Sequence, residues 1–297
     1  MNYISRLLIK ILAKCSPLIH NDKLYIKFEY LLYMGKKLKL KNPQTYNEKL
    51  QWLKLYDRKE EYSYMVDKIE AKKKVAKIIG EKYIIPTLGI FKCFEDINFE
   101  KLPNQFVIKC THNSGGVCIC TNKKDFNIEL AKKIINKSLH RNYFWNHREY
   151  PYKHIVPQII IEKYITSTTE DDLKDYKFFC FNGVPKLVLV ASNRQKGVYF
   201  DFFDMNFNHC PFRQENDKLS PHPIECPPLF EEMKKIAATL STGYSHIRID
   251  LYTANNKIYF GEYTFFNNSG YENFIPKEWD LIIGNWINLP PLTNKIQ

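Results

Sequence analysis

The chain has 297 residues, of which 44% are hydrophobic, so it can bury a core as one large domain or as two closely packed ones. This composition excludes a disordered or fibrous protein. The formal net charge is +12, and most of it lies in the N-terminal part of the chain. Residues 1 to 60 hold 13 Lys and Arg against 5 Asp and Glu, whereas residues 61 to 297 hold 31 against 27.

The positive charge bears on possible partners. Outside the N-terminal part it is scattered and forms no contiguous stripe, so we expect no nucleic-acid partner. An AT-rich coding genome is an alternative source of the many Lys residues. If the charge is selected, the first 60 residues predict a docking face for an anionic partner, such as a glycan precursor or the inner membrane leaflet.

Eight cysteines in a chain of this length are too sparse for a disulfide scaffold. We therefore expect reduced thiols and a cytoplasmic protein. Cys118 and Cys120 alternate in an apolar run and are predicted to face the same side of a strand. No second pair of Cys or His accompanies them in the sequence, so we expect no zinc site there.

The first segment with a clear pattern is MNYISRLLIKILAKC. Its apolar residues fall on one helical stripe, and its basic residues fall off it. The run is too short for a membrane span and too interrupted for a signal peptide. We favour a helix that packs its stripe on the domain over one that contacts a membrane interface. The stripe consists of Ile4, Leu7, Leu8, Ile11 and Leu12.

Helical spacing continues to about residue 60, and strand-like runs then alternate with helices. Hairpin turns at Asn182-Gly183 and Asn255-Asn256 join apolar runs of alternating character, which favours antiparallel sheets and an α+β fold. Predicted helices are 68–79, with Gly80 as C-cap, 127–140 and 229–240. Predicted strands lie within 83–91, 104–110, 155–165, 175–192, 197–208 and 245–265.

The strongest local motif is FVIKCTHNSGG. An apolar strand ends at Lys109 and is followed by a loop of small residues that includes Gly115 and Gly116. Backbone N–H groups of such a loop can surround phosphate oxygens, and a lysine on a strand adds a fixed positive charge. An ordinary β-turn beside a surface lysine is the alternative, because the motif lacks the GxxxxGK[ST] form of a P-loop.

A second motif places Arg248 and Asp250 on one face of a strand and Glu262 on the next strand. Two carboxylates that converge across a hairpin suit Mg²⁺, and an adjacent arginine can neutralise a transferring phosphoryl group. Simple charge pairing between the strands is the alternative.

The order of these features resembles the ATP-grasp superfamily. NEKLQWLK, VDKIEAKKKV, DYKFFCFNG and RIDLY…IYFGEYTFF look like its TupA-like branch, which is associated with surface-polysaccharide and teichuronopeptide biosynthesis. The resemblance covers about residues 43 to 285. It implies an α+β ATP-grasp fold in which two α+β subdomains, 61–165 and 166–297, sandwich ATP behind a helical preface of residues 1–60.

The resemblance also implies roles for individual residues, with ATP and Mg²⁺ as cofactors. Arg248 and Lys109 take the catalytic roles, and Asp250 and Glu262 take the metal-binding ones. The backbone of Lys163 and Ile165 would contact the edge of adenine. The full set of implied nucleotide contacts is Lys68, Lys109, His112, Asn113, Ser114, Gly115, Gly116, Glu162, Lys163, Tyr164, Ile165 and Lys177, with a surface lysine as the alternative for the last.

The chain departs from the family pattern in two places. Thr264 stands where many ATP-grasp enzymes have a metal-binding Asn, so Thr264, Asn267 or water are the candidates for that ligand. The usual α/β domain before the first lysine is replaced by about 60 helical residues. Candidate substrate contacts are Arg194, Asn267, Ser269 and Gly270, with ordinary turn chemistry as the alternative.

The resemblance implies an ATP-dependent ligase that joins a carboxylate, such as a hexuronic acid that is free, nucleotide-linked or part of a glycan, to a small amine. A glycosyltransferase of surface-polysaccharide biosynthesis is the alternative, although the sequence contains no D-x-D motif. We expect a cytoplasmic enzyme with peripheral contact to an anionic membrane or polysaccharide.

Overall fold

The computed structural model describes residues 3–166, 173–193 and 197–292. Helices make up most of the first 80 residues, as predicted. The side chain of Asn21 caps one of them, and Thr45 and Glu48 form a capping box at another. Asp67 caps the helix of residues 68–79, which ends before Gly80 as predicted. These helices are α1 (Tyr3–Cys15), α2 (Asp22–Met34), α3 (Tyr46–Tyr56), α4 (Glu61–Val66) and α5 (Lys68–Ile79).

Helix α1 has the predicted residues, but its apolar stripe is mostly uncovered. Of the five stripe residues only Leu12 is buried. The expectation that this stripe packs on the domain is therefore wrong for the other four. The helix instead contacts α2 and the short turn Ser16–Leu18 through a narrow side. The exposed stripe residues are Ile4, Leu7, Leu8 and Ile11.

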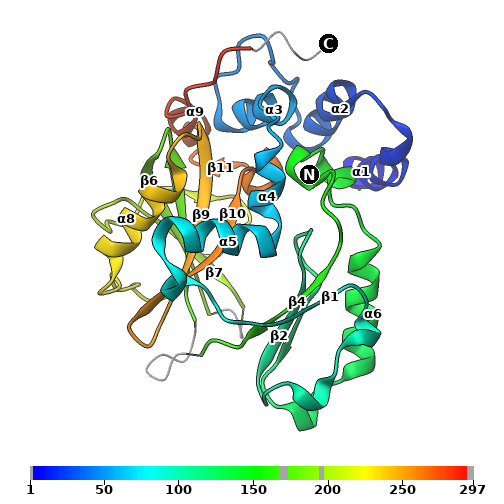
Figure 1. The fold of residues 1–297 in the computed structure, drawn as a ribbon. Coiled ribbons are helices and arrows are strands. Elements are labelled where there is room, and N and C mark those ends of the chain that lie inside the picture. The colour runs from blue at the N-terminus through cyan, green and yellow to red at the C-terminus, as the bar shows by residue number, and fades with distance from the viewer. Residues whose placement is uncertain (1–2, 167–172, 194–196, 293–297) are drawn as a thin grey trace.

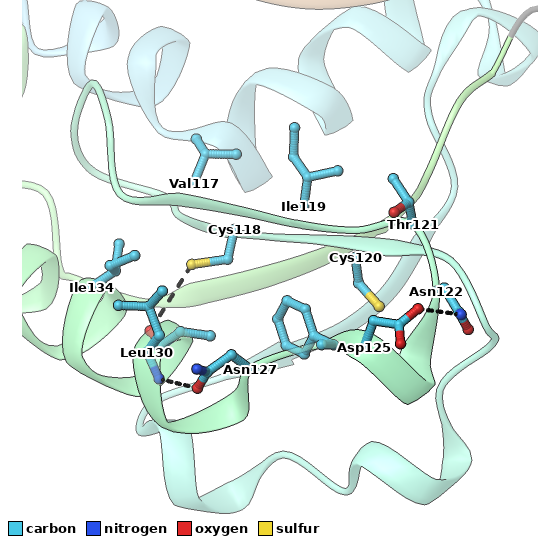
Figure 2. A pocket seen from close by; sticks show the side chains of 12 residues that line it. Val117, Cys118, Ile119, Cys120, Thr121, Asn122, Asp125, Asn127, Leu130 and Ile134 are labelled. Atoms are coloured by element: carbon cyan, nitrogen blue, oxygen red, sulfur yellow. Dashed lines mark hydrogen bonds between the residues drawn. The ribbon is translucent and has the colours of Figure 1, made fainter. Parts of the chain in front are cut away.

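A small antiparallel sheet follows, in the order β1-β4-β2-β3. One face packs on α6, where Phe106 and Ile108 meet Ala131 and Ile135 in a separate core cluster. Cys118 and Cys120 both point from β3 toward α6, whereas Val117 and Ile119 point away, as Figure 2 shows. The elements are β1 (Thr87–Phe91), β2 (Phe106–Cys110), β3 (Val117–Cys120), α6 (Ile128–Leu139), α7 (Phe144–His147) and β4 (Ile159–Lys163).

A larger antiparallel sheet has the order β10-β9-β5-β6-β7, with α8 packed on one face. Both predicted turns are present, and Asn182, Asn255 and Asn256 adopt positive φ, as Asn tolerates better than most residues. The elements are β5 (Asp175–Phe181), β6 (Val184–Ser192), β7 (Tyr199–Phe203), β8 (Arg213–Gln214), α8 (Phe230–Ser241), β9 (His246–Ala254), β10 (Lys257–Thr264), β11 (Phe274–Ile275) and α9 (Trp279–Gly284).

Helix α5 joins the two sheets. It packs on β10 of the large sheet, and its Lys72 forms an ion pair with Glu162 of the small sheet. Figure 1 shows α5 crossing the middle of the molecule, with the small sheet on one side and β9 and β10 on the other. Helices and antiparallel sheets together confirm the α+β class, while the subdomain boundaries at residues 60 and 165 stay predictions.

The eight cysteines all lie in described segments and are free thiols. Among the described residues, no helix combines the length and apolar character that crossing a membrane requires.

Candidate functional site

The first half of the site is a pair of lysines held by one carboxylate. Lys109 and Glu162 lie on neighbouring strands and point to the face of the small sheet opposite α6. Lys109 Nζ lies 2.6 Å from Glu162 Oε2, and Lys72 Nζ lies 2.6 Å from Glu162 Oε1. Burial alone would raise the pKa of Glu162, but Lys109 and Lys72 outweigh it and lower this pKa to about 2. Glu162 is therefore a carboxylate at neutral pH, and one positive charge remains for an anion.

Lys68 ties the start of α5 to the loop that follows β2. Its Nζ donates to the carbonyl oxygen of Asn113 at 2.7 Å, and its backbone N–H donates to that of Thr111 at 3.1 Å. Burial lowers the pKa of Lys68, the charge of Glu262 opposes this shift, and Lys109 adds to it. Lys68 therefore lies where Lys109 of the small sheet and Glu262 of the large sheet both act on it.

The glycine loop is anchored at its base and open at its tip. Asn113 Nδ2 donates to the hydroxyl of Ser138 at 2.7 Å, and His112 Nε2 lies 3.1 Å from the carbonyl oxygen of Arg141. His112 and Asn113 are buried by these contacts with the end of α6, whereas Ser114 and Gly115 are exposed. We infer that the tip, Ser114 to Gly116, is the part of the predicted phosphate loop that can reach a ligand.

Gly116 is fixed as glycine by both conformation and space. Its φ is 61°, and a Cβ at this position would lie 2.2 Å from Ser138 Oγ. Gly115, with φ of 93°, also needs glycine for its conformation, but it has open space around it. The end of α6 therefore sets how the loop turns.

The predicted adenine hinge lies at the end of β4. The backbone N–H of Lys163 donates to the carbonyl oxygen of Pro86 at 2.9 Å, so this N–H is already engaged and is not free for a base edge. Tyr164 and Ile165 are half-buried. A cavity of about 530 Å³ adjoins the hinge and is lined by Lys163 and Ile165, by residues 81–84 and Pro86, by Leu229 and Glu232, and by residues 256–259.

The second half of the site is a charged cluster on β5, β9 and β10. Arg248 donates to both oxygens of Asp250, at 2.7 and 2.8 Å, and Lys177 Nζ donates to Asp250 Oδ2 at 2.6 Å. The same Nη2 of Arg248 lies 3.5 Å from Glu262 Oε1. The two carboxylates therefore converge on one guanidinium, as the strand register requires.

These contacts determine how each residue could act. Burial alone would raise the pKa of Asp250, but Arg248 and Lys177 lower it, so Asp250 is ionised. Burial would lower the pKa of Lys177, but Asp250 and Asp175 raise it. The side chain of Lys177 is only 13% exposed, so the alternative of a surface lysine is wrong. Glu262 is 45% exposed and has no close cationic partner among the described residues other than Arg248.

The cluster can be tested for its fit to Mg²⁺. Among the described residues, no group of three or more His, Cys, Asp or Glu could hold a metal by itself. Mg²⁺ typically needs only one or two carboxylates plus phosphate oxygens and water. Asp250 accepts three N–H bonds, and a carboxylate has about four lone-pair positions, so one remains. Asp250 and Glu262 therefore fit Mg²⁺ if a nucleotide supplies further ligands.

Thr264 and Asn267 differ in their fit to the uncertain ligand position. Thr264 Oγ1 lies 3.4 Å from Glu262 Oε1, on the strand opposite Arg248. Asn267 is buried, and its Oδ1 accepts from Arg248 Nη1 at 2.6 Å, while its Nδ2 has no hydrogen-bond partner within the described segments. Both stay candidates, but Asn267 Oδ1 has only its second lone pair left, because the first accepts from Arg248.

Residues 268–270 form a left-handed turn that α3 supports. Their φ values are 44°, 54° and 66°. The carbonyl oxygen of Ser269 accepts from Gln51 and Lys54, at 3.0 and 2.7 Å, and that of Gly270 accepts from Gln51 at 2.7 Å. The hydroxyl of Ser269 donates to Glu149 and so points into the protein. Any contact between Ser269 or Gly270 and a substrate would therefore be a backbone contact.

Sequence reasoning missed Lys72, Gln51 and Lys54. Lys72 follows Lys68 by four residues and so shares its helix face, which was the available signal. Gln51 and Lys54 had no such signal, because their partners lie more than 200 residues away. Arg194 lies outside the described residues.

A family model for TupA-like ATP-grasp proteins matches residues 48–288. The chain belongs to this family. The matched range contains both halves of the site described above, while α1 and α2 precede it.

Solved structures that are similar to this chain at low identity include three ligases. D-Alanine–D-alanine ligase from Bacillus anthracis is 20% identical, with a TM-score of 0.39 over 75% of this chain and 59% of that one. The enzyme of the same name from Helicobacter pylori is 14% identical, with a TM-score of 0.43 over 83% and 70%.

The ATP-grasp ligase PsnB, complexed with minimal precursor, Mg and ADP, is 10% identical, with a TM-score of 0.40 over 74% and 57%. The chain thus spans less than two thirds of the Bacillus anthracis ligase and of PsnB. No curated protein matches it in sequence.

Proposed function

We propose that this ATP-grasp protein is an ATP- and Mg²⁺-dependent carboxylate–amine ligase. The observation that carries the proposal is the arrangement around the half-buried Lys68, on which Lys109 of the small sheet and Glu262 of the large sheet both act. Such an arrangement suits a nucleotide triphosphate, whose anionic oxygens need both fixed cations and a metal.

The proposed reaction has two steps. The substrate carboxylate forms a bond to the γ-phosphorus of ATP, the bond to the bridging oxygen breaks, and ADP leaves. The amine nitrogen then bonds to the acyl carbon, phosphate departs with the C–O electron pair, and the amine loses a proton to solvent. No covalent enzyme nucleophile is needed.

The residues of the chain act mainly by position and charge. Lys68 and Lys109 hold phosphate oxygens, and the exposed tip of the glycine loop offers backbone N–H groups to them. Arg248, held by Asp250 and Asn267, presents its guanidinium to charge that develops on the transferred group. Mg²⁺, when bound to Asp250 and Glu262, supplies Lewis-acid stabilisation of the phosphate oxygens.

The family suggests the substrates, and we adopt its suggestion. The proposed carboxylate is a hexuronic acid, free, nucleotide-linked or in a glycan, and the proposed amine is an amino acid or amino alcohol. The proposed setting is capsular or other surface-polysaccharide biosynthesis, in the cytoplasm. The family match favours this ligase over a glycosyltransferase.

The test measures ADP and phosphate release with ATP, Mg²⁺ and a matrix of uronic acids against amines. Release that requires both partners supports the proposal, whereas sugar transfer from a nucleotide sugar without ATP contradicts it. Binding is tested separately by melting, because a ligand at about 100 times its Kd adds roughly 2.7 kcal/mol to the unfolding free energy. We expect Lys68→Met to lose this shift.

The matched control is Lys73→Met on the same helix, since the side chain of Lys73 is 62% exposed and pairs only with Glu70 among the described residues. The control should keep the ATP-dependent shift. A folded wild-type protein with no shift at saturating ATP and Mg²⁺ would contradict nucleotide binding.

A further inference from the structure

The first two helices carry an unusual share of exposed apolar side chains. Of the 25 large hydrophobic side chains that are exposed in the described residues, nine lie between residues 3 and 31. Scattered exposed apolar residues are normal on a protein surface, but a concentration of this kind marks an interaction surface.

The exposed residues of α1 occupy a single stripe. At 100° per residue, Ile4, Leu7, Leu8 and Ile11 fall within one arc of about 100°, and all four are exposed. Arg6, Lys10 and Lys14 occupy the adjoining arc. The side that meets the protein carries Leu12 and the half-buried Ile9. Helix α1 therefore uses one narrow side for packing and presents its main apolar stripe, edged by basic residues, to the exterior.

Helix α2 repeats this arrangement. Leu24, Phe28 and Leu31 recur at helical spacing and are 62%, 43% and 41% exposed. Lys23 and Lys27 are also exposed. The opposite side of α2 buries Tyr25, Ile26, Glu29 and Tyr30 in the core. The two helices contact each other and lie at one corner of the molecule, as Figure 1 shows.

The acidic residues of this region are turned inward and paired. Residues 1 to 47 contain nine Lys and Arg but only two acidic residues, Asp22 and Glu29. Asp22 forms ion pairs with Arg58 at 2.8 Å and with Arg148 at 3.1 Å. Glu29 is 2% exposed. Its oxygens lie 2.8 Å from His147 Nδ1 and 2.6 Å from the hydroxyl of Tyr271. The carboxylates of α2 thus offset charge inside the protein, and the exterior keeps its basic character.

We propose that this surface binds the face of an anionic lipid bilayer. The α1–α2 face consists of Ile4, Leu7, Leu8, Ile11, Leu24, Phe28 and Leu31 with Arg6, Lys10, Lys14, Lys23 and Lys27. The apolar stripes enter the boundary between headgroups and acyl chains, and the basic side chains contact lipid phosphates. An acidic polysaccharide would match the lysines but would leave the leucine and isoleucine stripes in water.

The test is sedimentation of the full chain with vesicles at low ionic strength. The vesicles contain either phosphatidylcholine alone or a mixture with about one third phosphatidylglycerol. We expect retention by the anionic vesicles, little by the neutral ones, and release at high salt, because the Debye length falls to about 3 Å at 1 M. Absence of retention by anionic vesicles at low salt would overturn the proposal.

A pair of matched double variants separates the apolar stripe from net charge. Leu7→Glu with Ile11→Glu changes side chains that are 48% and 49% exposed, and Leu219→Glu with Leu281→Glu changes side chains that are 42% and 45% exposed. Both variants lower the net charge equally. We expect at least a tenfold loss of vesicle partitioning for the first and less than a twofold loss for the second, with equal melting temperatures. Equal losses would overturn the proposal.

Partners of the α1–α2 face other than a membrane would give different experimental results. If the α1–α2 face joins two copies of the chain, light scattering will show a dimer that Leu7→Glu with Ile11→Glu converts to a monomer. If an acidic polysaccharide covers it, that polymer will retain the protein while vesicles do not. Either result would overturn the membrane proposal.

Discussion

Replacing Glu262 by Gln should separate a metal-binding role from simple charge pairing, and the structure shows why Asp250 cannot do this. Glu262 is 45% exposed, and its contact with Arg248 is 3.5 Å long. Asp250 is buried and accepts three short bonds from Arg248 and Lys177. The two carboxylates share one guanidinium but differ greatly in how much the fold depends on them.

The expected magnitudes follow from this difference. An exposed ion pair contributes about 1 kcal/mol or less, so Glu262→Gln should leave the unfolding free energy nearly unchanged. Asp250→Asn leaves Arg248 without its buried partner and should cost about 3–5 kcal/mol. If Glu262 holds Mg²⁺, its change to Gln should lower turnover by at least about 100-fold, because a bound metal contributes several kcal/mol to catalysis.

The assay combines urea unfolding with the Mg²⁺ dependence of ADP release, measured on both variants and on Glu278→Gln as a control at an exposed site. We expect Glu262→Gln to fold normally with little turnover, Asp250→Asn to lose both, and the control to lose neither. Turnover within a few-fold of wild type in Glu262→Gln would refute its role as a metal ligand and would favour charge pairing.

Two further predictions concern buried groups. Burial lowers the pKa of Lys54 to about 8, whereas the pKa in the unfolded chain is 10.5, so between these values the unfolded chain binds the proton more tightly. The unfolding free energy of the wild type should therefore rise by about 3 kcal/mol, relative to that of Lys54→Met, as pH increases from 8 to 10.5. A difference in urea midpoints that stays constant with pH would contradict this. Gly116→Ala should lower the melting temperature more than Gly115→Ala, because only the former places a Cβ against Ser138, and equal shifts would contradict the contact.

The parts of the site that the sequence predicts are those set by local rules. Asp67 before an amphipathic run predicts the start of α5 and so places Lys68. Strand alternation predicts that Arg248 and Asp250 share a face of β9. Counted from the Asn-Asn turn alone, Glu262 would lie opposite Ile249; a β-bulge between Phe260 and Glu262 shifts the register and pairs Glu262 with Asp250. The positions of Lys68, Arg248 and Asp250 thus follow from a helical or strand period, whereas that of Glu262 also depends on the bulge.

The rest depends on which elements pack together. Lys72 and Glu162 are 90 residues apart, and their ion pair exists because α5 lies across the small sheet. The short pair β8 and β11 and the helix α9 carry too few residues for a period to be visible. From the sequence alone, Lys54 would be assigned to the exposed face of an amphipathic helix. In the structure, α9 and the turn at residues 267–270 pack on α3, and Lys54 is buried.

The positive charge of the first 60 residues also cannot be interpreted without knowing which elements pack together. A count of residues predicts an excess of positive charge, but it cannot say which charges face outward. In the structure, Arg148 and His147 from the segment before β4 pair with Asp22 and Glu29, so a distant part of the chain buries Glu29 and offsets the charge of the partly exposed Asp22. The spacing of apolar residues in α1 would be the same if the helix packed on the protein or lay at a membrane interface. What distinguishes the two is that the side bearing Leu12 is small and already covered, which leaves the larger apolar stripe for a partner outside this chain.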